Sequence, residues 1–137
     1  MKKYTLSIIA ILAAISVFGQ VTDFDERREL RKNLTVKEWN TEGKRRWLDR
    51  VTVYDHNGFK IEEIEYAAYG QKWRMTIEHE QGESGRTKQE ILYDHKNKPF
   101  RIRRYEYNAE GRKIKQYNYL PSGKLFSVKD FEYTVKK

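Results

Sequence analysis

The sequence contains no cysteine and only two prolines among its 137 residues. Without cysteine, the fold cannot depend on disulfide bonds, and metal–thiolate sites and cysteine nucleophiles are excluded. The chain also lacks a glycine-rich phosphate-binding loop and the serine elbow of hydrolases. Because these absences remove several enzyme classes, we predict a non-enzymatic protein without a catalytic residue, a cofactor or a bound metal.

Long apolar segments are missing as well, apart from residues 6–18, which follow Lys2 and Lys3. A basic start, a short apolar run and the end Val17-Phe18-Gly19 are typical of a secretory signal peptide, so residues 1–19 are predicted to be removed. The run is short for a bilayer-spanning helix, although a membrane anchor is the alternative. We expect an exported protein, periplasmic, at the outer surface or secreted, with no transmembrane segment after cleavage.

The chain that remains is rich in both charged and aromatic residues. Charged residues make up 35% of the sequence and aromatic residues 14%, and the net charge is +8, or +6 without Lys2 and Lys3. The aromatic content separates the chain from disordered proteins, and its length fits one domain. A basic exported protein favours anionic partners. The alternative is that Lys, Arg and Glu only solvate a sheet and protect its edges.

A short phrase recurs along the chain, consisting of an aromatic residue, usually Asp or Asn, two variable residues, Gly or Asn, and often a base. It is found at 39–44, 54–59, 66–71, 93–98, 107–112 and 119–124. Asp or Asn at the first position of a type I turn accepts backbone hydrogen bonds, and the later Gly or Asn supplies a left-handed conformation. The phrase therefore predicts an all-β fold, an antiparallel β-meander of seven or eight strands. The longer turn at 80–85 is the exception.

The predicted strands repeat too. Residues 59–66 return as 100–107 and again as 126–133, and the first two copies lie 41 residues apart. This spacing indicates duplication of a two-hairpin unit. Before the sheet, Asp23 to Leu34 is predicted to form a short helix, with a solvated linker as the alternative. The predicted organisation is a signal peptide at 1–19, a helical or linker segment at 20–35 and a repeat sheet at 36–137.

The turn register predicts which side chains share a face of the sheet. One face is expected to be an apolar core face that includes Val53, Ile61, Trp73 and Met75. The opposite face is expected to gather tyrosines and bases, and its candidate binding surface is Tyr105, Tyr107, Tyr117, Tyr119, Arg101, Arg103, Lys113 and Lys115. A β-bulge in these strands would exchange part of the assignment.

A tyrosine ring beside a Lys or Arg side chain is a good cross-strand pair and also a way for a sheet to bind an anionic polymer. We therefore expect an acidic glycan, an anionic lipid surface or a partner protein as the ligand, in preference to a nucleic acid. One alternative is a tyrosine ladder that only stabilises an open sheet. Another is a small periplasmic enzyme or inhibitor whose site lies in the irregular loop at 80–86. His56 and His95 occupy equivalent turn positions, which indicates repeat inheritance and not a metal site.

The phrase Tyr-Asp-x-x-Gly followed by a base resembles the YD repeats of RHS-type bacterial surface and toxin-shell proteins. The phrase is also similar to repeats of small exported Bacteroidetes proteins. A signal peptide ending in Phe18-Gly19-Gln20 resembles the signal peptides of Bacteroidetes-type bacteria. The likeness covers residues 36–137. It implies an extended antiparallel β-meander at the cell surface or in the periplasm, and it carries over no catalytic residue.

The signal-peptide interpretation predicts that the exported protein begins at Gln20. Mass spectrometry of the exported protein should give the mass of residues 20–137. An intact Met1 in a membrane fraction would contradict the prediction.

Overall fold

The computed structural model describes residues 26–82 and 84–137, so the predicted signal peptide and the first residues of the predicted helix lie outside the described residues. A short helix spans residues 26–31, within the predicted helical segment. The strands are β1 (Thr35–Glu42), β2 (Arg45–Tyr54), β3 (Lys60–Ala67), β4 (Gly70–His79), β5 (Thr87–Tyr93), β6 (Pro99–Tyr107), β7 (Lys113–Tyr119) and β8 (Leu125–Asp130).

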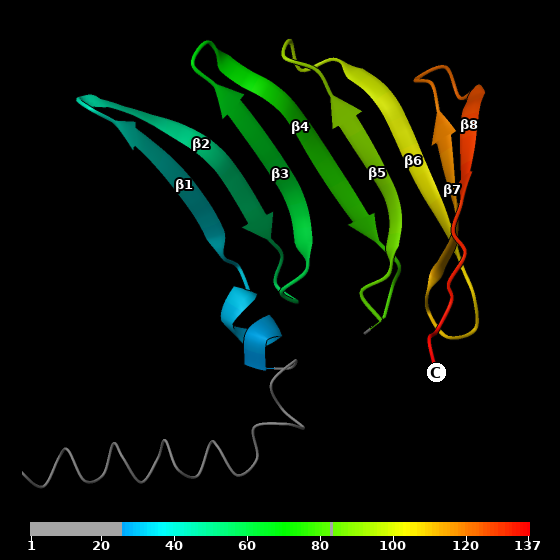
Figure 1. Ribbon diagram of the computed structural model, residues 1–137. Helices are drawn as coiled ribbons and strands as arrows, with labels where there is room; N and C mark the ends of the chain where they lie inside the picture. The colour runs from blue at the N-terminus through cyan, green and yellow to red at the C-terminus, as the bar shows by residue number, and fades with distance from the viewer. Residues whose placement is uncertain (1–25, 83) are drawn as a thin grey trace, which may run out of the picture.

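The eight strands form one open sheet in the order of the chain, and each strand is antiparallel to its neighbours. Figure 1 shows an arched single layer, with β1 and β8 at its two edges and the short helix below the ends of β1 and β2. The predicted all-β meander is confirmed. Within residues 26–82 and 84–137, no helix is long and apolar enough to cross a membrane.

Four of the hairpin turns repeat one geometry. At the β2–β3 turn, the Asp55 N–H donates to the Phe59 carbonyl over 2.9 Å, and the Gly58 N–H donates to the Asp55 carbonyl over 3.0 Å. The Asp55 carboxylate accepts two further backbone N–H groups, those of Asn57 and Phe59, each at 2.9 Å. The same pattern recurs at residues 94–98 and 108–112, and at 120–124 its backbone part recurs alone. The predicted turn, with its left-handed Gly or Asn, is confirmed at these four places. At 39–44 and 66–71 the prediction is wrong, because two-residue loops place Glu42 opposite Arg45 and Ala67 opposite Gly70.

Each pair of neighbouring strands also contains one β-bulge or irregularity. In five pairs, the second residue of the later strand has no partner in the earlier one; these residues are Ile61, Lys88, Phe100, Ile114 and Phe126. A bulge bends its strand and increases the local twist. The repeated bulges therefore account for the arch of the sheet in Figure 1.

The bulges also change the register that the turns alone predict. Val53 lies opposite Glu62 and not opposite Ile61, because Ile61 is the extra residue of its bulge. Farther along, Glu65 lies opposite Trp73, as the turn register predicts. The predicted membership of the apolar face is therefore wrong, because one inserted residue moves every later side chain of that strand to the other face.

The prediction of a core face is wrong in a second way, because no second layer covers either face in the described part of the chain. Val51 and Ile77 are the buried hydrophobic side chains there, with 9% and 8% of their surface exposed. Arginines instead cover aromatic rings across the strands: Arg46 lies 4.6 Å from the ring centre of Trp39, and Arg74 lies 4.7 Å from that of Tyr93. Cross-strand pairs of this kind stabilise a sheet that has water on both sides.

The short helix packs against the β2–β3 turn. The Asn33 N–H donates to the Asp55 carbonyl over 2.8 Å, and the Arg28 guanidinium lies 5.3 Å from the ring centre of Phe59. A Cβ atom on Gly58 would lie 2.2 Å from the Arg28 carbonyl oxygen. Glycine at this position therefore serves both the turn and the docking of the helix.

Two glycines allow these roles to be separated, since Gly58 and Gly123 occupy equivalent turn positions with φ of 82° and 90°. Gly123→Ala introduces only the left-handed strain, which costs roughly 1–2 kcal/mol, because nothing lies within 4 Å of its new Cβ. We expect Gly58→Ala to reduce the free energy of unfolding by more, because its Cβ also displaces Arg28. Chemical denaturation of both variants measures the difference, and equal losses would contradict the docking of the helix.

Candidate binding surface

The eight residues predicted to form one binding surface lie on both faces of the sheet. Tyr105 lies opposite Gln116, and its neighbour Arg104 lies opposite Tyr117. Because successive residues of a strand point to opposite faces, Tyr105 and Tyr117 are on different sides. The cause is the bulge at Ile114, which shifts β7 by one residue relative to the register set by the 108–112 turn.

The two sides of the sheet, face 1 and face 2, divide these eight residues. Face 1 carries Arg101, Arg103, Tyr105, Tyr107 and Lys113 from the predicted surface, and the Lys113 ammonium lies 3.9 Å from the ring centre of Tyr105. Face 2 carries the other three, Lys115, Tyr117 and Tyr119. The prediction of a single shared face is therefore wrong, and binding by any of these residues stays a prediction.

On face 2, several charged groups are paired with one another. Ion pairs join Arg74 to Glu62 at 2.8 Å, Lys88 to Glu78 at 3.4 Å and Lys115 to Asp130 at 3.8 Å. The Tyr117 hydroxyl donates to the Glu106 carboxylate over 2.9 Å, which raises the pKa of this phenol. Arg104 of the same face forms no ion pair among the described residues; its guanidinium donates to Gln89 and lies 5.6 Å from the ring centre of Tyr119.

Face 1 contains an apolar hollow of about 360 Å³, lined by Trp73, Met75, Leu92, Phe100 and Arg103. Strand register brings these residues together, since Met75 lies opposite Leu92 and Leu92 lies opposite Arg101. The bulge at Phe100 turns its ring to the same side. A concave apolar surface with a few polar groups is the usual form of a ligand site.

Two arginines beside this hollow have an unsatisfied nitrogen, although Glu90 lies opposite Arg103 on the neighbouring strand. Nη1 of Arg101 and Nε of Arg103 are buried and make no hydrogen bond. The Arg101 guanidinium lies 4.1 Å from the ring centre of Phe126, a cation–π contact that leaves its charge without a counterion. Among the described residues, neither arginine forms an ion pair. An uncompensated guanidinium at a half-buried position is destabilising unless an anion or water satisfies it.

The two tyrosines of face 1 are held by hydrogen bonds to the protein. The Tyr105 hydroxyl donates to the Glu90 carboxylate, and the Tyr107 hydroxyl donates to the Thr87 carbonyl over 2.7 Å. Burial raises the pKa of Tyr105, and the hydrogen bond to Glu90 raises it further; burial also raises the pKa of Tyr107. Both phenols thus stay neutral, and their rings form a fixed wall beside the arginines.

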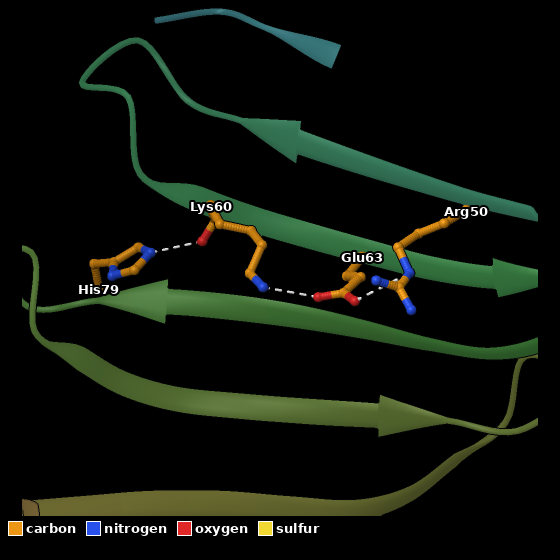
Figure 2. A network of polar contacts seen from close by, with 4 residues as sticks. All are labelled: Arg50, Lys60, Glu63 and His79. Carbon is orange, nitrogen blue, oxygen red and sulfur yellow. Dashed lines mark hydrogen bonds and ion pairs between the residues drawn. The ribbon is translucent and has the colours of Figure 1, made fainter. Parts of the chain in front are cut away.

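Two other basic residues of face 1, Lys60 and Arg50, are paired with an acidic residue within the sheet. Figure 2 shows Glu63 between Lys60 and Arg50, at 2.8 Å and 3.6 Å. At the end of this network, the two ring nitrogens of His79 face carbonyl oxygens, that of Lys60 at 2.7 Å and that of Gly85 at 3.0 Å. Among the described residues, Arg101 and Arg103 of β6 form no ion pair, and Lys113 and Lys129 of the same face form none either.

The irregular turn borders a second hollow, of about 430 Å³, whose lining includes Asp55, Phe59 and His79. Glu83 lies outside the described residues, so the alternative of a site at 80–86 stays open. His56 and His95 are exposed at their turns. Among residues 26–82 and 84–137, no group of three or more His, Asp or Glu side chains is placed to hold a metal ion.

Sequence reasoning placed Arg101 and Arg103 on one face but missed the hollow beside them. It assigned Trp73 and Met75 to the core of the opposite face, since the bulges are not visible in the alternation of residues. Nothing in the sequence pattern around Leu92, apart from its apolar side chain, indicated that it lines a hollow.

Comparisons with known proteins add little. No protein-family model matches the chain, and no curated protein matches it. Among solved structures, the chain is similar to part of a "GtfA/B complex bound to UDP and GlcNAc", with a TM-score of 0.33 and 15% sequence identity. The match covers 69% of this chain and 19% of that chain, so the chain spans about a fifth of its length.

The environment of Tyr105 predicts a pH dependence. Because its pKa is raised in the folded state, its contribution to stability is fully present below the ordinary tyrosine pKa of about 10 and is lost as the pH rises through the higher folded value. We expect the wild type to lose unfolding free energy above about pH 10 more steeply than Tyr105→Phe. Glu90→Gln, which removes the neighbouring charge, should give an intermediate slope. Identical slopes for all three proteins in denaturant titrations would refute this.

Proposed function

We propose that the protein is an exported, non-enzymatic binding module that holds an acidic glycan on face 1. The observation that carries the proposal is the pair Arg101 and Arg103, which lies beside an apolar hollow and forms no ion pair among the described residues. Export rests on the predicted signal peptide at residues 1–19.

The chemistry of the hollow favours a carboxylate-bearing sugar chain. Guanidinium groups bind carboxylates with two parallel hydrogen bonds, and the rings of Trp73 and Phe100 offer flat apolar surfaces to sugar C–H groups. Arg103 lines the hollow itself, and Arg101 lies two residues earlier on the same strand and face. A single open layer leaves room for a long polymer that crosses several strands.

The test is binding of the purified protein to polygalacturonate, with neutral dextran as the comparison. We expect polygalacturonate alone to bind, with an affinity that falls as salt rises. Arg101→Gln combined with Arg103→Gln should weaken binding roughly tenfold or more, since a hydrogen bond to a charged group contributes about 1.5–3 kcal/mol.

A matched control is the double variant Lys88→Gln and Arg104→Gln, which removes the same charge from face 2. If binding depends only on net charge, both double variants should lose affinity equally, and the site on face 1 would be wrong. Binding to anionic lipid vesicles but not to polygalacturonate would replace the glycan with a lipid surface. If neither ligand binds, the tyrosines and arginines serve the sheet alone.

A further inference from the structure

Both edges of the sheet are open in the described part of the chain, because β1 and β8 each pair with one strand only. Figure 1 places them on opposite sides of the arch. All six residues of β8 are exposed, and Leu125, Phe126 and Val128 expose 48%, 60% and 40% of their surface. Soluble proteins usually protect such an edge with charged side chains, proline, a bulge or a covering segment. β8 has a bulge at Phe126 and the charges of Lys129 and Asp130, but it contains no proline, and no other strand covers it among the described residues. We propose that β8 of one copy pairs with β1 of a second copy, and that the sheet continues from chain to chain.

The backbone directions of the two edges are compatible. The Phe131 N–H donates inward to the Ile114 carbonyl over 3.0 Å, so by alternation Asp130 and Val128 direct their N–H and C=O groups outward. At the other edge, the Leu34 carbonyl accepts inward from the Tyr54 N–H over 2.9 Å. Lys37 and Trp39 therefore direct their backbone groups outward. Antiparallel pairing requires outward residues to lie opposite each other.

One register also pairs the charges. With Asp130 opposite Lys37 of the second copy, Lys129 lies opposite Glu38, and Val128 lies opposite Trp39. A shift of two residues in either direction places Asp130 opposite Thr35 or Trp39. Neither Asp130 nor Lys129 then lies opposite a residue of opposite charge. Opposite charges directly across two strands are favourable, and like charges are unfavourable.

The same register keeps the faces in line. Lys129 lies opposite Gln116, which itself lies opposite Tyr105, so Lys129 belongs to face 1. Glu38 lies opposite Arg50, whose ion pair with Glu63 places it on face 1 as well. With an even number of strands, β1 of an identically oriented copy runs antiparallel to β8. The contact joins two different surfaces, so it can repeat and form an open fibre or a closed ring.

Sedimentation velocity over a range of protein concentrations tests the proposal. We expect the wild type to associate as concentration rises. Glu38→Lys and Lys129→Glu should each weaken association about three- to tenfold, since each places like charges opposite one another. An equimolar mixture of the two variants should associate as the wild type does, because each edge then meets a complementary charge.

The mixture separates the proposal from a general loss of stability, which mixing cannot repair. Lys88→Glu, at an exposed position of inner strand β5, is the matched control and should associate normally. Val128→Pro removes a backbone N–H that points away from β7 and makes no bond to it. The variant should therefore lose association, while its circular dichroism spectrum stays unchanged. A wild type that stays monomeric at all concentrations, or a mixture that fails to recover association, would overturn the proposal. Glycan binding by the monomer does not depend on this edge contact, so the two tests fail independently.

Discussion

The sheet depends on hydrogen bonds within its turns, in which backbone N–H groups donate to the side chain of the first turn residue. The carboxylates of Asp55 and Asp94 and the amide of Asn108 each accept two backbone N–H groups of the following residues. These bonds determine where one strand ends and the next begins. The carboxylate of Asp94 prefers the charged state in this setting, and its backbone hydrogen bonds lower its pKa. In a chain with little buried hydrophobic surface, this local geometry replaces a core as the source of order.

A single layer changes what its residues can do. In a two-layer sandwich, an arginine such as Arg103 would be excluded from the inner face, because burial of an unpaired charge costs too much. Here the same face is close to water, so aromatic and basic side chains lie side by side. The contacts between arginines and rings that hold the strands together are thus of the same kind as those that would hold a ligand.

The sequence predicted the parts of the structure that depend on local chemistry. The turns at residues 55–59 and 108–112 follow from Asp or Asn and glycine at fixed spacing, and the meander follows from the turns. The faces could not be predicted, because Ile114 and Phe100 look like ordinary strand residues, and the insertion that each makes is visible only in the pairing of neighbouring strands. The sequence also could not predict that the described residues form a single layer. Apolar residues such as Trp73 and Met75 are compatible with a core or with an open hollow.

The order of the strands has a consequence for how the molecule folds and unfolds. Each strand packs mainly against the strands next to it in the chain, as in a repeat protein, so contacts join consecutive hairpins and not distant parts of the chain. Local contacts need little loop closure, and folding can begin at any hairpin and spread in both directions. Unfolding should reverse this path and begin with the outer strands. Amide hydrogen exchange would then be slowest in β3 to β6 and faster toward both edges, a gradient that a globular core does not produce.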